Sequence, residues 1–238
     1  MANYLITGAA GFIGSRLAQM FIDEGNKVTT IDNLSTGFKS NIPKGVLFIE
    51  GDCSSSKAID KLPKETFDAI FHIAGQSSGE ISFDDPVYDI KTNTESTLLL
   101  LKFALKNGCS RFIYAGTMSV YGIQGNHAVN ENADCKPESF YGVGKLASEH
   151  YLRIYEKYGI ESTSLRLFNV YGPGQNLSNL RQGMVSIFLA QMLNNSHIHV
   201  KGSKHRYRDF IHIDDVVEAF QRCLICNESI GEMINIAT

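Results

Sequence analysis

A tyrosine and a lysine stand four residues apart, as Tyr141 and Lys145, in the stretch FYGVGKLASEHY (140–151). The apolar residues that follow recur at helical spacing, so we expect the pair on one face of a helix, with Cβ atoms about 5–6 Å apart. An ammonium group at that distance favours the ionised form of a phenol, which can then act as a base. Gly142 and Gly144 weaken a helix, and we interpret them as room for a flat ligand. A surface Tyr–Lys pair at a frayed helix start is the alternative that this stretch alone leaves open.

A glycine-rich turn near the N-terminus predicts a dinucleotide site. In YLITGAAGFIGSRLAQMF, the residues Gly8, Gly11 and Gly14 follow an apolar strand and open a helix. Such a turn brings backbone amides and a helix N-terminus against a pyrophosphate. A second strand ends at Asp32, 18 residues beyond Gly14, where a carboxylate accepts from a ribose 2′-hydroxyl and repels a 2′-phosphate. We therefore predict NAD rather than NADP; a glycine turn with a capping aspartate is the alternative.

The elements that must position these residues alternate along the chain. Strands are predicted over 3–7, 28–32, 46–50, 69–74, 111–115, 163–168 and 197–200, and helices over 12–24, 92–107, 140–158 and 183–195. Because the strands are nearly all apolar, we predict an α/β fold, a doubly wound parallel sheet (Rossmann fold) covered on both faces. From about residue 169 the sequence becomes polar and loop-like. We predict an NAD-binding domain over 1–168 and a small, incomplete substrate lobe over 169–238, laid over the carboxyl edge of the sheet.

The composition limits the classes of function. The 238 residues are 43% hydrophobic and 20% charged, with a net charge of −3, which is ordinary for a globular protein and gives no reason to expect nucleic acid or a membrane as partner. No apolar run reaches the length of a transmembrane helix. Five cysteines without framework spacing indicate a reducing compartment. We therefore expect a cytoplasmic protein.

Three further patterns have simpler interpretations than the functional ones. Cys223 and Cys226 fall in an amphipathic helix pattern with no second pair, and are interpreted as free thiols. His197 and His199 alternate on one predicted strand without a nearby carboxylate or cysteine, so no metal site is predicted. A basic cluster fits a diphosphate-binding rim better than a nucleic-acid surface, because the chain is negative overall. Its members are Lys201, Lys204, His205, Arg206 and Arg208.

With the glycine loop, Asp32 and Tyr141-x-x-x-Lys145 in this order, the chain resembles the extended short-chain dehydrogenase/reductases, and among them the NAD-dependent nucleotide-sugar epimerase/dehydratase group. Matching motifs cover essentially the whole chain: IDNLSTG (31–37), EGDCS (50–54), FHIAGQSS (71–78), KTNTESTLLLL (91–101), YAGTMSVYG (114–122), RLFNVYGPG (166–174) and RDFIHIDDV (208–216). The resemblance implies an NAD site. Its implied residues are Gly8, Gly11, Phe12, Ile13, Gly14, Asp32, Asn33, Ser35, Gly37, Asp52, Cys53, Ala74, Gly75, Gln76, Asn93, Tyr141 and Lys145.

The same resemblance implies a catalytic group of Thr117, Tyr141 and Lys145. Tyr141 would remove a proton from a sugar hydroxyl as the carbon's hydride leaves for NAD, and the Thr117 hydroxyl would hydrogen-bond the same oxygen. Ionising an unperturbed tyrosine at neutral pH requires roughly 4 kcal/mol, which Lys145 and the positive nicotinamide ring would supply. Lys145 would also anchor the nicotinamide ribose. The implied contacts to the nucleotide-sugar are Ser119, Asn169 and Arg208.

The residues beside Thr117 suggest which reaction follows oxidation. Dehydratases of this group carry an Asp-Glu pair there and decarboxylases a glutamate, whereas this chain has Met118 and Ser119, neither of which is a general acid or base at neutral pH. We therefore expect NAD-dependent epimerisation at C4 of a UDP-sugar through a transient 4-keto intermediate. Another nucleotide-sugar oxidoreductase or decarboxylase, and a catalytically incomplete NAD-binding fragment, stay open as alternatives.

Two departures from the group's pattern give further expectations. Gly144 stands where the group usually has serine, at a position that is not itself catalytic. Members of the group continue well beyond the stretch GEMINIAT (231–238). We therefore expect a complete NAD site, a missing part of the sugar lobe, and a sugar cleft open to solvent. We also expect a homodimer, formed through the helices at 92–107 and 140–158.

Overall fold

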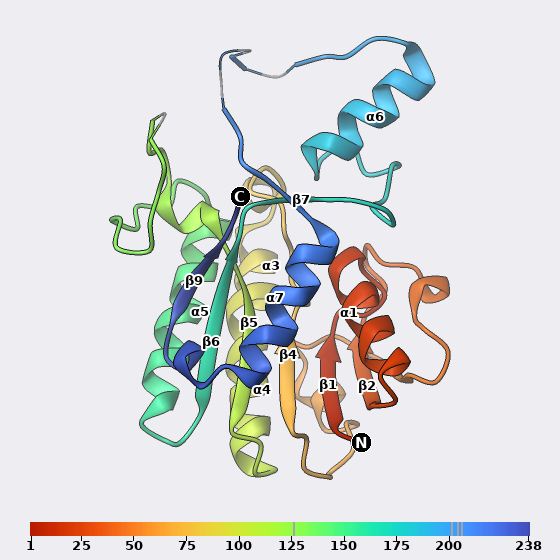
Figure 1. Cartoon of the computed structure of the whole chain (residues 1–238), viewed down its shortest axis with the longest axis vertical. Helices are drawn as coiled ribbons and strands as arrows, with labels where there is room; N and C mark the ends of the chain where they lie inside the picture. The colour runs from red at the N-terminus through yellow and green to blue at the C-terminus, as the bar shows by residue number, and fades with distance from the viewer. Residues whose placement is uncertain (126, 201, 204, 206) are drawn as a thin grey trace.

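The chain folds around one large parallel sheet. A computed structural model describes residues 1–125, 127–200, 202, 203, 205 and 207–238. Seven strands lie in the order β3-β2-β1-β4-β5-β6-β9, and every neighbouring pair is parallel. With helices on both faces (Figure 1), this order confirms the predicted doubly wound α/β fold. The strands are β1 (Asn3–Thr7), β2 (Lys27–Asp32), β3 (Leu47–Glu50), β4 (Ala69–His72), β5 (Arg111–Thr117), β6 (Glu161–Leu167) and β9 (Met233–Ile236).

The apolar strands feed two cores, one on each face of the sheet. Successive residues of β1 alternate between them, with Tyr4 and Ile6 in one core and Leu5 in the other. The first core is closed by α1 (Phe12–Asp23) and α7 (Ile213–Ile225). The second is closed by three helices: α2 (Ser56–Ile59), α4 (Ser96–Lys106) and α5 (Phe140–Glu156). None of the described helices is long and apolar enough to cross a membrane.

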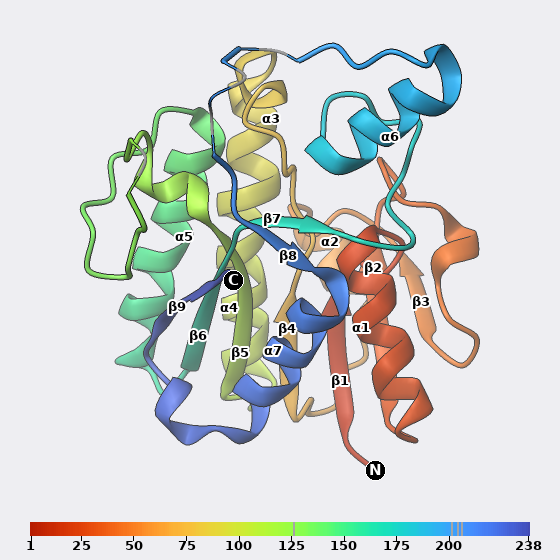
Figure 2. The same ribbon diagram turned by 45° about the horizontal axis from the view of Figure 1, so that its top comes forward.

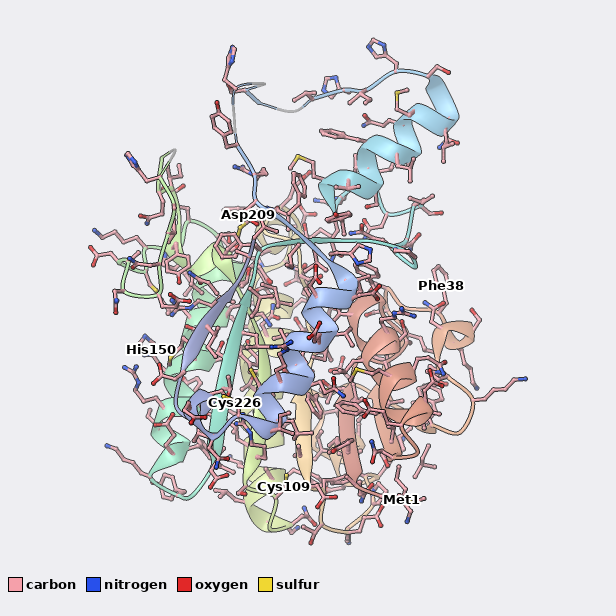
Figure 3. The ribbon with its side chains drawn as sticks, viewed as in Figure 1. Met1, Phe38, Cys109, His150, Asp209 and Cys226 are labelled. Atoms are coloured by element: carbon pink, nitrogen blue, oxygen red, sulfur yellow. The ribbon has the colours of Figure 1, made fainter. Side chains whose placement is uncertain are left out.

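A smaller layer lies beyond the carboxyl ends of the strands. It contains a second sheet of two parallel strands, β7 (Asn169–Tyr171) and β8 (Phe210–His212), and the helix α6 (Met184–Asn195) (Figure 2). Asp209, labelled in Figure 3, lies at this edge of the molecule, whereas Met1 and Cys109 lie at the opposite edge. Both α7 and β9 then return to the large sheet. The boundary at residues 168 and 169 stays a prediction.

The structure differs from the predicted elements in two places. Residues 197–200 form no strand. Ile198 and Val200 are exposed there, so their alternation does not face a core; the strand of this layer is β8 instead. The helix predicted over 92–107 is divided, because a π-helical turn, η3 (Lys91–Glu95), precedes α4. The remaining short helices are α3 (Pro86–Ile90), η1 (Lys39–Asn41), η2 (Ile81–Phe83), η4 (Met118–Tyr121) and η5 (Asn227–Ser229).

Candidate functional site

A cavity of about 300 Å³ opens at the carboxyl edge of β1, β2 and β4. This is the edge where open α/β sheets bind their ligands. Fourteen of the predicted cofactor residues line it: Gly8, Gly11, Phe12, Ile13, Gly14, Asp32, Asn33, Ser35, Gly37, Asp52, Cys53, Ala74, Gly75 and Gln76. Residues far apart in the sequence therefore meet around one cavity, as the sequence predicted. That they bind NAD stays a prediction.

The glycine loop is built so that backbone, and not side chain, faces the cavity. A Cβ on Gly8, which has φ +80°, would lie 2.9 Å from the Ala74 nitrogen, and one on Gly14 would lie 2.2 Å from the Gly8 oxygen. Side chains at these two positions would therefore displace the loop. Gly11 is the N-cap of α1 and provides no side-chain cap, so the first amides of the helix have no side-chain acceptor there. Such amides suit a pyrophosphate, and the loop fits NAD.

Two carboxylates line the cavity, one at the end of β2 and one shortly after β3. Asp32 accepts from the backbone amides of Ala10 at 3.0 Å and Leu34 at 2.8 Å, which fixes its carboxylate at the strand end. Asp52 accepts from the Asn33 amide group at 2.9 Å. Partial burial raises the pKa of Asp52, but hydrogen bonds from Ser54 and Asn33 outweigh it and lower the pKa overall. Carboxylates accept hydrogen bonds from hydroxyl and amino groups, so both residues stay predicted contacts of an adenosine.

Tyr141 and Lys145 lie in the first two turns of α5, and both are buried. The helix begins there because the Ser139 hydroxyl accepts from the Gly142 amide at 3.0 Å. Burial raises the pKa of Tyr141 to about 12, although a hydrogen bond with Thr117, at the end of β5, lowers it. Burial lowers the pKa of Lys145 to about 8, against the pull of Asp89 and Glu149. The catalytic group predicted from the sequence is thus assembled where β5 and α5 meet.

The two glycines beside Tyr141 serve packing within the protein. A Cβ on Gly142 would lie 2.7 Å from the Ser119 carbonyl oxygen. A Cβ on Gly144 would lie 3.2 Å from the Thr94 hydroxyl and 3.3 Å from a carboxylate oxygen of Asp89. The interpretation that these glycines make room for a flat ligand is therefore wrong. They let α5 approach η4 and the π-helical turn η3.

The predicted nucleotide-sugar residues lie at the same edge, in η4 and in or next to the strands β7 and β8. Asn169 begins β7 and donates to the Asp209 carbonyl oxygen at 2.6 Å. Ser119 lies in η4, and its amide donates to the Thr117 hydroxyl at 3.2 Å. Arg208 precedes β8, whose Phe210 pairs with Asn169. Of the predicted basic rim, His205 and Arg208 are exposed, whereas Lys201, Lys204 and Arg206 lie outside the described residues.

The sequence analysis missed a segment that closes the cavity from the second layer. Its carboxamide side chains line the cavity opposite the glycine loop: Gln175, Asn176, Asn179 and Gln182. The segment is fastened to the loop after β4, since Gln182 donates to the Ser77 hydroxyl and Arg181 pairs with Asp84 at 2.7 Å. The signal for it was the run of amide residues in GQNLSNLRQ (174–182), directly after the predicted crossing into the lobe.

Asn93 supports the cavity without being part of its lining. Its amide group donates to the Gln76 carbonyl oxygen at 2.9 Å and to a carboxylate oxygen of Asp89 at 3.1 Å. The Gln76 amide group donates to the same Asp89 oxygen at 2.8 Å. Asp89, which is fully buried, was missed by the sequence analysis. These three side chains form a buried network between the cavity and the start of α5.

Comparison with known proteins agrees with this geometry. The sequence profile of the NAD dependent epimerase/dehydratase family matches residues 4–237. The UDP-glucose 4-epimerase of Thermotoga maritima, solved with UDP-glucose, is 34% identical and has a TM-score of 0.94; the match covers 99% of this chain and 77% of that one. The Thermus thermophilus UDP-glucose 4-epimerase, solved with NAD, is 31% identical with a TM-score of 0.89, over 99% of this chain and 78% of that one. UDP-glucuronic acid decarboxylase 1 of Xenopus tropicalis is 31% identical over 98% of this chain and 55% of its own length.

Proposed function

The chain belongs to the NAD-dependent epimerase/dehydratase family, and from this membership we propose that it is a UDP-sugar 4-epimerase. It is accordingly an NAD-dependent nucleotide-sugar enzyme, and the proposal concerns the reaction. The substrate is a UDP-sugar whose C4 configuration is inverted through a transient 4-keto sugar.

The observation that carries the proposal is the composition of the turn beside the catalytic group. Thr117, Tyr141 and Lys145 lie together, and η4, which follows Thr117 directly, reads Met-Ser-Val-Tyr. A dehydratase or a decarboxylase needs a general acid or base in addition to Tyr141, and Met118, Ser119 and Val120 provide none near pH 7. The Tyr121 hydroxyl is engaged with Asn235 and Arg166, and burial raises its pKa. Oxidation and return of the hydride to the opposite face need no further acid or base than Tyr141.

The side chains of this chain provide the proton transfer. Bound NAD would accept the hydride from C4, return it later and, in its oxidised form, add a positive charge. As the C4–H bond breaks, the C4 hydroxyl proton passes to the Tyr141 oxygen, while the Thr117 hydroxyl holds the substrate oxygen in line. With a pKa of about 12, ionising Tyr141 near neutral pH costs roughly 7 kcal/mol. The Lys145 ammonium, one helical turn away, offsets part of that cost.

The similarity to a UDP-glucuronic acid decarboxylase gives a second candidate reaction. That reaction would release carbon dioxide from a UDP-uronic acid. The absence of a carboxylate from η4 favours epimerisation over it. A chain that binds NAD without turning over a sugar is the third outcome.

The test separates these outcomes in one set of incubations. Protein with NAD is mixed with UDP-glucose, UDP-N-acetylglucosamine or UDP-glucuronic acid, and the products are resolved by chromatography. We expect the C4 epimer of one substrate with no net NADH. Release of carbon dioxide from UDP-glucuronic acid, or steady NADH accumulation, would refute the proposal in favour of the second class.

Tyr141→Phe identifies the base in the same assay. The ring is kept and only the ionisable oxygen is lost, so we expect NAD affinity to remain and turnover to fall by about 10³-fold or more, within the range of a lost acid–base catalyst. Binding of NAD is measured by calorimetry and epimer formation by chromatography. Normal turnover by Tyr141→Phe would exclude Tyr141 as the base.

A further inference from the structure

We propose that Asp89 is a positioning residue of this site, whose buried carboxylate keeps Lys145 in its ammonium form and aligns the carboxamides of Gln76 and Asn93 under the cofactor cavity. The inference rests on the proposed function, because it assigns Lys145 a role in the reaction. Asp89 itself need not touch substrate or NAD.

The first step is the geometry of Asp89. It lies in α3, which starts at Pro86 with the Asp85 side chain as its cap, accepting from the Tyr88 amide at 2.9 Å. The side chain is 0% exposed. One carboxylate oxygen accepts from the Gln76 and Asn93 amide groups, at 2.8 and 3.1 Å. Burial raises the pKa of Asp89, although these two hydrogen bonds and the charge of Lys145 act to lower it. Two donors on one oxygen thus offset part of the cost of burying the ionised form.

The second step is the other oxygen, Oδ2. It is buried without a hydrogen-bond partner among the described residues. It lies 3.3 Å from the place that a Cβ on Gly144 would take, directly before Lys145 in α5. A side-chain hydroxyl at position 144 could donate to it, and glycine provides none. A buried carboxylate oxygen that no donor compensates acts strongly on nearby charges, because little solvent screens it.

The third step is to compare the groups that face Lys145. On α5, Glu149 already pairs with Arg166 at 2.7 Å, so its charge is compensated. On β4, burial lowers the pKa of His72 to about 3, so this ring is neutral. On β5, Lys145 Nζ lies 4.4 Å from the centre of the Tyr114 ring, and burial raises the pKa of that phenol, so it too is neutral.

The buried phenol of Tyr141 is also neutral in this state, since burial raises its pKa to about 12. Two carboxylates raise the pKa of Lys145, Asp89 and Glu149. Of these two, Asp89 forms no ion pair within hydrogen-bonding distance among the described residues. Burial alone would drive Lys145 toward the neutral amine, and Asp89 opposes this. Since the pKa of Lys145 is only about 8, a loss of this carboxylate would bring deprotonation into the neutral range.

The experiment follows the titration of Lys145 directly. Protein labelled with ¹³C and ¹⁵N in lysine is titrated by NMR without substrate, and the Lys145 signal is assigned with Lys145→Met. In Asp89→Asn, which keeps size and hydrogen-bonding shape, we expect the Lys145 midpoint to fall by about one pH unit. Asp60→Asn removes the same charge at an exposed site in the α2 region and is the control; its Lys145 midpoint should equal that of the wild type.

A second variant keeps the proposal testable if Asp89→Asn folds poorly. Gly144→Ser retains the carboxylate but adds a donor beside Oδ2, so the Lys145 midpoint should fall in the same direction by a smaller amount. An unchanged midpoint in folded Asp89→Asn, or in Gly144→Ser, would overturn the proposal. Because the titration needs no turnover, its result is independent of whether the chain epimerises a UDP-sugar.

In the active enzyme, a matching change is expected in the pH profile. The alkaline limb of kcat, where the Lys145 ammonium is lost, should move to lower pH in Asp89→Asn, and the Asp60→Asn profile should match the wild type. A uniform loss of kcat at all pH values, with the limb in place, would indicate a structural role only and would also overturn the proposal.

Discussion

At the scale of one residue, the buried ammonium of Lys145 lowers the stability of the folded protein. Its pKa is lowered from 10.5 to about 8 by burial, so below pH 8 the folded protein keeps an ammonium that the unfolded chain solvates more easily. The unfolded chain binds more protons between pH 8 and 10.5, so this residue's contribution makes stability rise with pH across that window. Its penalty is greatest below pH 8 and vanishes above pH 10.5.

Lys145→Met should therefore be more stable than the wild type at pH 7, by about 3 kcal/mol for a shift of this size. The advantage should shrink between pH 8 and 10.5. Urea unfolding of both proteins at pH 7 and at pH 9.5 measures it. An equal difference at the two pH values would mean that Lys145 is not titrating in this window.

Gly144 offers a second test at this scale, with alanine as the matched control for serine. Both substitutions add the same Cβ, 3.2 Å from the Thr94 hydroxyl, so both meet the same packing. Alanine has the higher helix propensity. Serine can also donate to the unpartnered Asp89 oxygen, which should be worth about 1–3 kcal/mol. We expect Gly144→Ser to be the more stable of the two in urea unfolding; the reverse order would show that Oδ2 gains nothing from a donor.

At the scale of elements, a buried ion pair joins β6 to α5. Arg166 and Glu149 lie 2.7 Å apart with side chains 6% and 2% exposed, and Arg166 also donates to the Tyr121 hydroxyl at 2.7 Å. Arg166→Met leaves the carboxylate buried without its cation and should cost about 3–5 kcal/mol. Adding Glu149→Leu should recover most of that loss. The exposed Arg222–Glu218 pair is the control, and Arg222→Met should change stability by about 0.5 kcal/mol or less.

Chemical denaturation of the wild type, Arg166→Met, Arg166→Met with Glu149→Leu, and Arg222→Met measures these changes in the free energy of unfolding. If Arg166→Met costs no more than Arg222→Met, the pair does not hold β6 and α5 together. If the double variant is no more stable than Arg166→Met, lost packing and not the unpaired charge explains the cost.

The elements whose pattern is local were predictable from the sequence. The strands β1 to β6 are short, and each starts within about two residues of its predicted start, whereas no bounds were predicted for β9. The alternation of apolar residues at 197–200 gave a wrong strand prediction. A strand needs a neighbouring strand to pair with, and the local sequence pattern does not reveal one. In the candidate site, the glycine loop and Asp32 were identified by their spacing in the sequence. The buried position of Asp89 results from the packing of α3 on α5, which no local pattern shows. The purpose of Gly142 depends on a carbonyl in η4, more than twenty residues earlier in the chain.

At the scale of the whole molecule, we expect the predicted homodimer to form through apolar side chains exposed on η2, α3 and α5. Phe83 and Phe140 stack edge to face with ring centres 5.5 Å apart, and both are exposed. Val87 and Ile90 of α3 and Val143 of α5, two helices that pack together, are each more than half exposed. Contiguous apolar surface of this kind is typical of an interface. This surface adds α3 to the helices predicted to form the contact.

Val87→Lys should therefore shift the protein from dimer to monomer, because it brings two like charges into a two-fold interface. Sedimentation velocity measures the change. Ile225→Lys, at the end of α7 and also highly exposed, is the control and should leave the dimer intact. A wild-type protein that sediments as a monomer at high concentration would contradict the prediction.

Arg111 connects β5 of the large sheet to segments far along the chain. It lies at the start of β5, is 7% exposed, and donates to the Thr163 hydroxyl at 2.8 Å, the Ser229 hydroxyl at 3.0 Å and the Cys223 carbonyl oxygen. Two of these three acceptors come from the end of α7 and from η5, which the ribosome makes more than a hundred residues after Arg111. Until that segment has emerged during synthesis, the guanidinium has only its acceptors on β6, Glu161 and Thr163, and water must take the place of the others. The surroundings of Arg111 are thus completed by a segment made more than a hundred residues later, so we expect the start of β5 to join the core only once α7 and η5 have docked on it.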